Sequence, residues 1–180
     1  MGQHLPPPPT PPPPTGDRLD LLRRLGYADL EHDSHVPFLS HLLGTRRVLV
    51  AWGERPALCD AGLFHSAYGT EYFLPDVAAD PDEVRSVIGA EAEAIARTWC
   101  TIRRDTLGAE EPFTAVERDS GEVLTLGRRL AGDIATLWAA DTVEQIDRME
   151  PDERDFARGL GRILHLASPA ARAAARPVLP

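Results

Sequence analysis

Residues 80–102, which read DPDEVRSVIGAEAEAIARTWCTI, indicate most clearly how this chain folds. Asp80 is a favourable N-cap residue, and Pro81 suits the first turn of a helix. The acidic residues that follow, Asp82 and Glu83, place negative charge at the positive end of the helix dipole. Apolar side chains then recur at helical spacing along one stripe: Val84, Val87, Ile88, Ala92 and Ile95. The stretch therefore predicts one long amphipathic helix and a mainly helical fold.

Similar signals on both sides of this stretch predict a bundle of about six helices. The other five helices are expected at residues 17–25, 34–52, 56–69, 128–149 and 151–166. Residues 113–126 differ, because the segments FTAVE and EVLTL flank the turn sequence Arg118-Asp119-Ser120-Gly121. This pattern predicts one short β-hairpin that lies against the helices.

The distribution of proline divides the chain into a tail and a domain. Eight of the 17 prolines lie between Pro6 and Pro14, where they favour an extended polyproline II conformation. Residues 1–16 are therefore expected to be a disordered tail, which either binds an SH3-like partner or has no fixed partner. Residues 17–168 are expected to form a single helical domain, and residues 169–180 a frayed C-terminal segment.

Composition argues against several classes of function. The net charge is -9, and the chain has no continuous basic stripe that would bind nucleic acid. No apolar run approaches the roughly 20 residues that a membrane-spanning helix needs. The two cysteines form neither a disulfide framework nor a thiolate metal site. We therefore expect a cytoplasmic protein with a small-molecule ligand or substrate, and composition leaves its oligomeric state open.

Two histidines lie on consecutive predicted helices and are the first candidates for chemistry. His41 is flanked by apolar residues in the second helix, and His65 lies among apolar and small residues in the third. A single histidine of this kind is usually a core residue with one hydrogen bond. Antiparallel helices joined by a short loop bring two such residues together, and converging imidazoles suit metal binding or acid–base catalysis.

The spacing of these residues resembles the HD superfamily of helical, metal-dependent phosphohydrolases, with a layout closest to the (p)ppGpp-hydrolase branch. The segments HLLGT at residues 41–45 and GLFHSAYGTEYF at residues 62–73 resemble a small HD-related domain family. Ala140-Asp141 resembles the distant Ala-Asp pair of the branch. The resemblance implies an HD-like bundle in which His41, His65 and Asp141 bind a divalent Fe, Mn or Zn ion.

Ser66 departs from the superfamily pattern, because it stands where the HD motif has a metal-bridging aspartate. A serine hydroxyl brings neither the charge nor the metal affinity of a carboxylate. Two alternatives remain open. Either His41, His65 and Asp141 form a two-histidine, one-carboxylate site, completed by His35 or Glu71, or the metal has been lost and the pocket keeps only its shape.

Other residues near the HD-like motif are candidates for catalysis or substrate binding. Glu71 lies among aromatic residues and is a candidate general acid or base; alternatively it pairs with an arginine such as Arg46 or Arg47. Ser66, Tyr68 and Gln145 are candidates for substrate binding, since Gln145 lies one helical turn after Asp141.

Three hypotheses about function follow. The first is a metal-dependent small-molecule enzyme, either a phosphoester hydrolase or an oxygenase, with Glu71 as the acid–base group. The second is a metal-free enzyme in which His65 and Glu71 exchange protons. The third is a non-catalytic ligand-binding or interaction module with a degenerate HD site.

Overall fold

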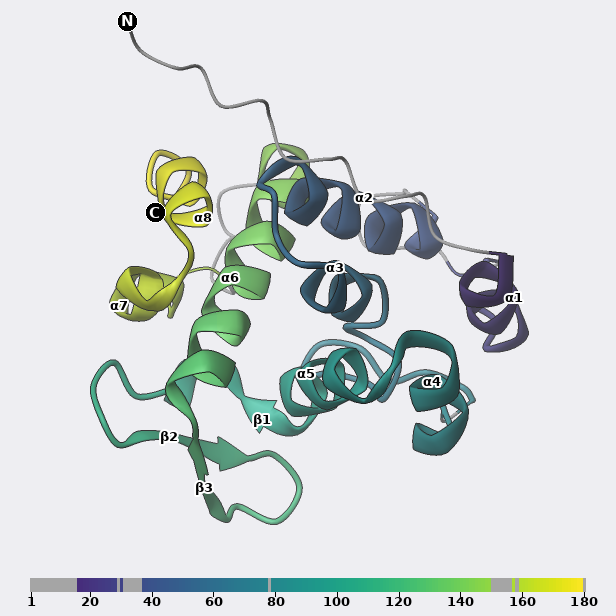
Figure 1. Ribbon diagram of the computed structural model, residues 1–180, viewed down its shortest axis with the longest axis horizontal. Coiled ribbons are helices and arrows are strands. Elements are labelled where there is room, and N and C mark those ends of the chain that lie inside the picture. The colour runs from purple at the N-terminus through teal and green to yellow at the C-terminus, as the bar shows by residue number, and fades with distance from the viewer. Residues whose placement is uncertain are drawn as a thin grey trace, which may run out of the picture.

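The computed structural model describes residues 16–28, 30, 37–77, 79–149, 157 and 159–179. Almost all of the proline-rich tail lies outside these residues, as do His35 and residues 151–156 of the last helix expected before the C-terminus. Within the described residues the chain is mainly helical, as its sequence predicts, and carries a small antiparallel sheet (Figure 1). The helices are α1 (Gly16–Arg24), α2 (Phe38–Ala51), α3 (Pro56–Leu63), α4 (Pro81–Ile88), α5 (Ala90–Thr101), α6 (Arg128–Gln145), α7 (Leu160–Ile163) and α8 (Pro169–Ala175).

Helix α6 lies at the centre of the fold and packs against α2, α3, α5 and α8 (Figure 1). Its side chains are buried on almost every side, which is typical of a helix enclosed by others. Four of them are fully buried alanines, whose small side chains allow neighbouring helices to approach closely: Ala131, Ala135, Ala139 and Ala140. The site described below is built on this helix.

The helix expected over residues 80–102 is two helices in the structure, and this corrects the predicted count of about six. The predicted start is present, because the Asp80 side chain accepts a hydrogen bond from the Asp82 N–H at 2.9 Å. The break is at Gly89, whose φ of 86° lies outside the helical region. Glycine adopts this conformation at little steric cost, so α4 ends there and α5 begins in a new direction.

The hairpin predicted at residues 113–126 is present as β2 (Phe113–Glu117) and β3 (Val123–Leu126). A third strand, β1 (Ile102–Arg103), pairs antiparallel with β2 and extends the hairpin to a sheet of order β1-β2-β3. Phe113 and Ala115, which are two residues apart on β2, are both buried, because every second side chain of a strand points to the same face of the sheet. The strand β1 was not predicted, because two residues are too few to show an alternating pattern.

The C-terminal residues differ from the frayed segment that the sequence suggests. Ser168 caps α8 by accepting a hydrogen bond from the Ala171 N–H at 3.3 Å. Ala171 and Ala175, one turn apart, are fully buried, and α8 packs against α6. The small alanine side chains therefore allow this segment to pack closely against α6.

Within the described residues, no helix is both long and apolar enough to span a membrane.

Candidate metal centre

Helix α2 carries His41 into the core. The helix begins at Phe38, directly after Pro37, and Phe38, Leu42 and Leu49 are buried along its inner side. His41 lies three residues after Phe38 on this inner side, and only 2% of its surface is exposed. Helical spacing therefore places an imidazole among apolar side chains, where its nitrogens need specific partners.

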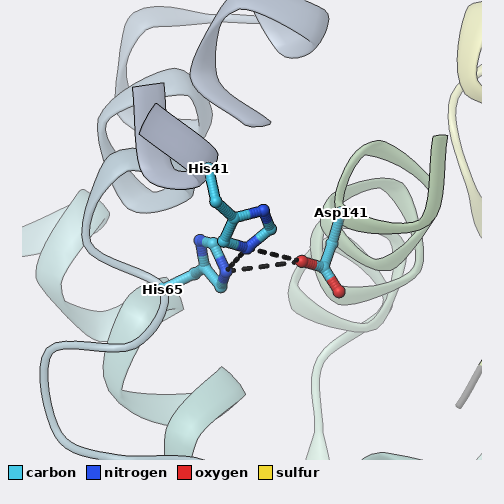
Figure 2. Close-up of side chains that lie close together, drawn as sticks. All are labelled: His41, His65 and Asp141. Carbon is cyan, nitrogen blue, oxygen red and sulfur yellow. Dashed lines mark hydrogen bonds and ion pairs between the residues drawn. The ribbon is translucent and has the colours of Figure 1, made fainter. Parts of the chain in front are cut away.

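His65 lies in the turn that follows α3. Its Nδ1 donates a hydrogen bond to the Gly62 carbonyl at 2.7 Å, so in the neutral ring Nε2 carries a lone pair. This Nε2 faces His41 (Figure 2). A Cβ atom at Gly62 would collide with the Leu49 side chain of α2, so glycine is needed where the two helices approach.

Asp141 on α6 completes a triangle with the two histidines, and all three side chains are buried (Figure 2). The two Nε2 atoms are 3.2 Å apart. The Asp141 Oδ1 atom lies 3.2 Å from Nε2 of His41 and 3.4 Å from Nε2 of His65. The structure therefore brings the three metal ligands implied by the HD resemblance to one point.

Glu144 is the fourth residue of the site, and it was not among the residues predicted from the sequence. Its Oε2 accepts a hydrogen bond from Nδ1 of His41 at 2.6 Å. Arg148, one turn further along the chain, donates to both carboxylate oxygens of Glu144 at 2.8 Å. Because Glu144 follows Asp141 by three residues on one helix, the i,i+3 rule would have placed the two carboxylates on the same face.

The carboxylates control the protonation of the site. Burial lowers the pKa of His41, but hydrogen bonds and charges from Asp141 and Glu144 outweigh burial and raise this pKa to about 9. Burial likewise opposes ionisation of Asp141, yet its contacts with His41 and His65 hold its pKa well below the usual range. In the metal-free protein, His41 therefore carries a second proton on Nε2, at the centre of the triangle.

The geometry of the triangle fits a metal ion in place of that proton. Ligands at about 2.0–2.1 Å from a tetrahedral ion are separated by about 3.3 Å, close to the three distances observed here. Two histidines and one carboxylate leave coordination positions open, as in sites where a metal ion binds water or substrate. Nδ1 of each histidine already donates to an oxygen, which leaves both Nε2 atoms for the ion.

Glu71 pairs with an arginine, as one of the two alternatives drawn from the sequence has it, but the arginine is Arg104 and not Arg46 or Arg47. The turn at residues 70–73, closed by a hydrogen bond from the Thr70 N–H to the Phe73 carbonyl, places Glu71 beside Arg104. The Glu71 Oε2 and Arg104 Nε atoms are 3.4 Å apart. Among the described residues, no hydrogen bond or ion pair joins Glu71 to His65: Glu71 pairs with Arg104, and His65 Nδ1 donates to the Gly62 carbonyl.

The candidate substrate-binding residues lie around the triangle without joining it. Ser66 is buried, and its carbonyl accepts a hydrogen bond from the Tyr27 hydroxyl at 3.1 Å. The Tyr68 hydroxyl donates to the Glu93 carboxylate at 3.2 Å in a partly buried contact. Gln145 is buried at the end of α6. His35, one of the two residues considered for completing the metal site, lies outside the described residues.

Comparison with known proteins identifies a family match over the first part of the fold. Residues 21–104 match a family model described as a domain of unknown function, DUF6817. The matched segment contains His41 and His65, whereas Asp141 and Glu144 lie beyond it. No curated protein and no solved structure matches the chain.

Proposed function

We propose that the chain is a small-molecule enzyme on an HD-like scaffold, in which His41, His65 and Asp141 hold one divalent Fe, Mn or Zn ion. The supporting observation is the triangle formed by two imidazole nitrogens and one carboxylate oxygen, with edges of 3.2, 3.2 and 3.4 Å. The ligands come from α2, the turn after α3, and α6, which is the order that the HD resemblance implies.

Ser66 favours a single ion over a pair. The hydroxyl group that replaces the bridging aspartate adds no negative charge, so Asp141 is the only carboxylate within the described triangle. One divalent ion is balanced by Asp141 together with Glu144, whose charge reaches the ion through His41. A second divalent ion would leave uncompensated positive charge in the core.

Once bound, such an ion supplies either an activated water for phosphoester hydrolysis or open positions for dioxygen and an oxidisable substrate. The residues of this chain hold the ligands in place. The Gly62 carbonyl orients His65, Glu144 orients His41, and Arg148 holds Glu144. This arrangement favours a metal-dependent enzyme over a metal-free His65/Glu71 enzyme, since Glu71 pairs with Arg104.

Metal analysis of protein purified without a histidine tag tests the proposal. We expect about one equivalent of Fe, Mn or Zn in the wild-type protein, and loss of that metal in His65→Ala and Asp141→Asn. His165→Ala is the matched control, because His165 is exposed and its Nε2 contacts only the Ala109 carbonyl at 3.0 Å among described residues. Wild-type protein that stays metal-free after incubation with each ion would contradict the proposal.

A Ser66→Asp variant separates a working metal site from a lapsed one. If the proposal is correct, wild-type protein already binds one ion, and the added carboxylate only changes the affinity or the number of ions bound. Metal binding by Ser66→Asp together with none in the wild type would favour the third hypothesis, a ligand-binding module with a degenerate HD site.

A further inference from the structure

Arg104 is a buried arginine whose hydrogen-bonding capacity is largely unused. It follows β1 directly, and only 6% of its surface is exposed. Across the described residues, its guanidinium group donates no hydrogen bond, and its one ion pair is the 3.4 Å contact of Nε with Glu71. None of its nitrogens is among the fully buried, unpaired side-chain atoms of the described residues, so the N–H groups without a protein partner face solvent, where an added acceptor can reach them.

This guanidinium group lies over two aromatic rings. Its Cζ atom lies 4.2 Å from the centroid of the Trp99 ring and 5.4 Å from that of the Tyr72 ring. Cation–π attraction of this kind holds the cation against the ring and does not use its N–H groups, which can still donate to planar or tetrahedral oxyanions. The aromatic contacts therefore help to hold the guanidinium group without satisfying its donors.

The position of Arg104 connects it to the candidate metal centre. The Trp99 ring that stacks on Arg104 also meets the His65 ring edge to face, with centroids 5.8 Å apart. One side chain therefore separates the guanidinium group from a metal ligand. The Glu71 and Tyr72 side chains, which also contact Arg104, are 20% and 69% exposed, so solvent reaches these neighbours of the guanidinium group.

We propose that Arg104 binds the anionic group, carboxylate or phosphate, of a small molecule that enters beside the His41–His65–Asp141 centre. Glu71 occupies the arginine in the free protein and is displaced when the anion binds. The role of the anion as part of a substrate rests on the function proposed above, whereas the binding of an anion at Arg104 does not require the metal.

Tryptophan fluorescence of the full chain tests this proposal, because Trp99 lies against the guanidinium group. EDTA-treated protein is titrated with inorganic phosphate and, separately, with acetate at constant ionic strength, so that neither metal binding nor general screening contributes. We expect saturable binding of at least one of the two anions, and the relative affinities show whether phosphate or carboxylate is preferred. Arg104→Met is expected to weaken binding by about tenfold or more.

Arg103→Met is the matched control, since it removes the same charge from the neighbouring, half-exposed arginine that contacts Asp105 at 3.6 Å. We expect the affinity of this variant to stay within about twofold of the wild type. Glu71→Gln is expected to bind the anion about two- to fivefold more tightly, because it removes the competing carboxylate. Such a gain cannot arise from misfolding, which protects the test against an unstable Arg104 variant.

Equal anion affinity in the wild type and a folded Arg104→Met variant would overturn the inference. Absence of binding in both the wild type and Glu71→Gln would overturn it as well, and so would equal losses in Arg103→Met and Arg104→Met. Because the titration uses metal-free protein, a failure here is distinct from a failure of the metal analysis.

Discussion

The two nitrogens of the His41 ring face different partners, and the difference determines what the ring binds. Nδ1 donates to Glu144, and Nε2 faces His65 and Asp141. A carboxylate behind a metal-binding histidine fixes the tautomer and makes the ligand more basic. Glu144 is therefore expected to act on the metal through His41, without contacting the ion.

Replacing Glu144 should weaken metal binding while the protein still folds. We expect Glu144→Ala to lower the metal affinity by about 10- to 100-fold, as for other carboxylates that support a histidine ligand, and Glu144→Gln to lower it less. Competition with a calibrated chelator measures the affinity. Asp147→Asn is the control, because Asp147 is an exposed acid near the same end of α6. Unchanged affinity in Glu144→Ala would show that the carboxylate has no such role.

The raised pKa of His41 predicts how the stability of the metal-free protein changes with pH. The folded protein binds the His41 proton more tightly than the unfolded chain does, since the pKa is raised from 6.5 to about 9. The resulting stabilisation is complete below about pH 6.5 and is lost as the pH rises through 9. Urea unfolding in EDTA at pH 6 and pH 9.5 measures it.

His41→Gln provides the reference for that measurement, because it keeps a polar side chain but has no titratable proton. The difference in free energy of unfolding between the wild type and His41→Gln should favour the wild type more at pH 6 than at pH 9.5. A difference that stays constant over this range would mean that the proton is not held in the triangle.

At the scale of the helices, glycines determine how closely the elements of the site approach one another. Gly62 allows α3 to pack on α2, as described above. Gly44 on α2 has an equivalent role toward α6, because a Cβ atom there would lie 2.5 Å from Oε1 and 2.7 Å from Cγ of Glu144. Glu144 can therefore reach His41 only because Gly44, one turn after His41 on α2, has no side chain.

Gly44→Ala should reduce metal affinity and also fail to stabilise the helix. An alanine normally gains about 0.5–1 kcal/mol over glycine inside a helix, but here its Cβ would displace Glu144 from His41. Gly161→Ala is the control, since a Cβ at this helical position meets nothing within 4 Å. Thermal unfolding and a metal titration of both variants check the prediction. Higher stability with full metal affinity in Gly44→Ala would contradict it.

The helices and strands that the sequence predicts correctly are those set by contacts between residues close together in the chain. The start of α4 follows from the Asp80 cap and the first-turn acids, and the β2–β3 hairpin from its turn. The break at Gly89 is not visible in the sequence, because glycine also occurs inside helices and only tertiary packing sets its φ of 86°. The third strand is likewise a product of packing against β2.

The features of the candidate site also fall into those that the sequence predicts and those that it does not. The sequence predicts that His41 and His65 converge, and they do, although α3 ends at Leu63, short of the predicted residue 69, and His65 lies in the turn after it. Asp141 was placed by resemblance. The pairing of Glu71 with Arg104 was not predicted, because it depends on how the turn after His65 meets the chain beyond α5. Long-range contacts of this kind carry no local signal.

Across the whole molecule, the three proposed ligands come from elements that are distant in sequence. His41, His65 and Asp141 belong to α2, the turn after α3, and α6, so a bound ion links the outer helices to the central one. An ion that binds only the folded state stabilises that state in proportion to the logarithm of its concentration over Kd.

Removal of the metal with EDTA should therefore lower the Tm of the wild type, and return of the ion should restore it. At a free metal concentration of about 100 times Kd, the expected stabilisation is about 2.7 kcal/mol. Asp141→Asn should show no metal-dependent change in Tm, whereas His165→Ala should behave as the wild type does. Scanning calorimetry measures both, and a wild-type Tm that is insensitive to the ion would contradict the prediction.

The placement of Asp141 on a late helix also affects the order in which the centre is assembled during synthesis. The ribosome releases both imidazoles well before α6, so a nascent chain presents two histidines without their carboxylate. Such a pair binds a divalent ion more weakly and less selectively than the complete set. If the proposed ion binds here, its full ligand set exists only after the central helix has left the exit tunnel, and metal loading would then be a late step in the maturation of the protein.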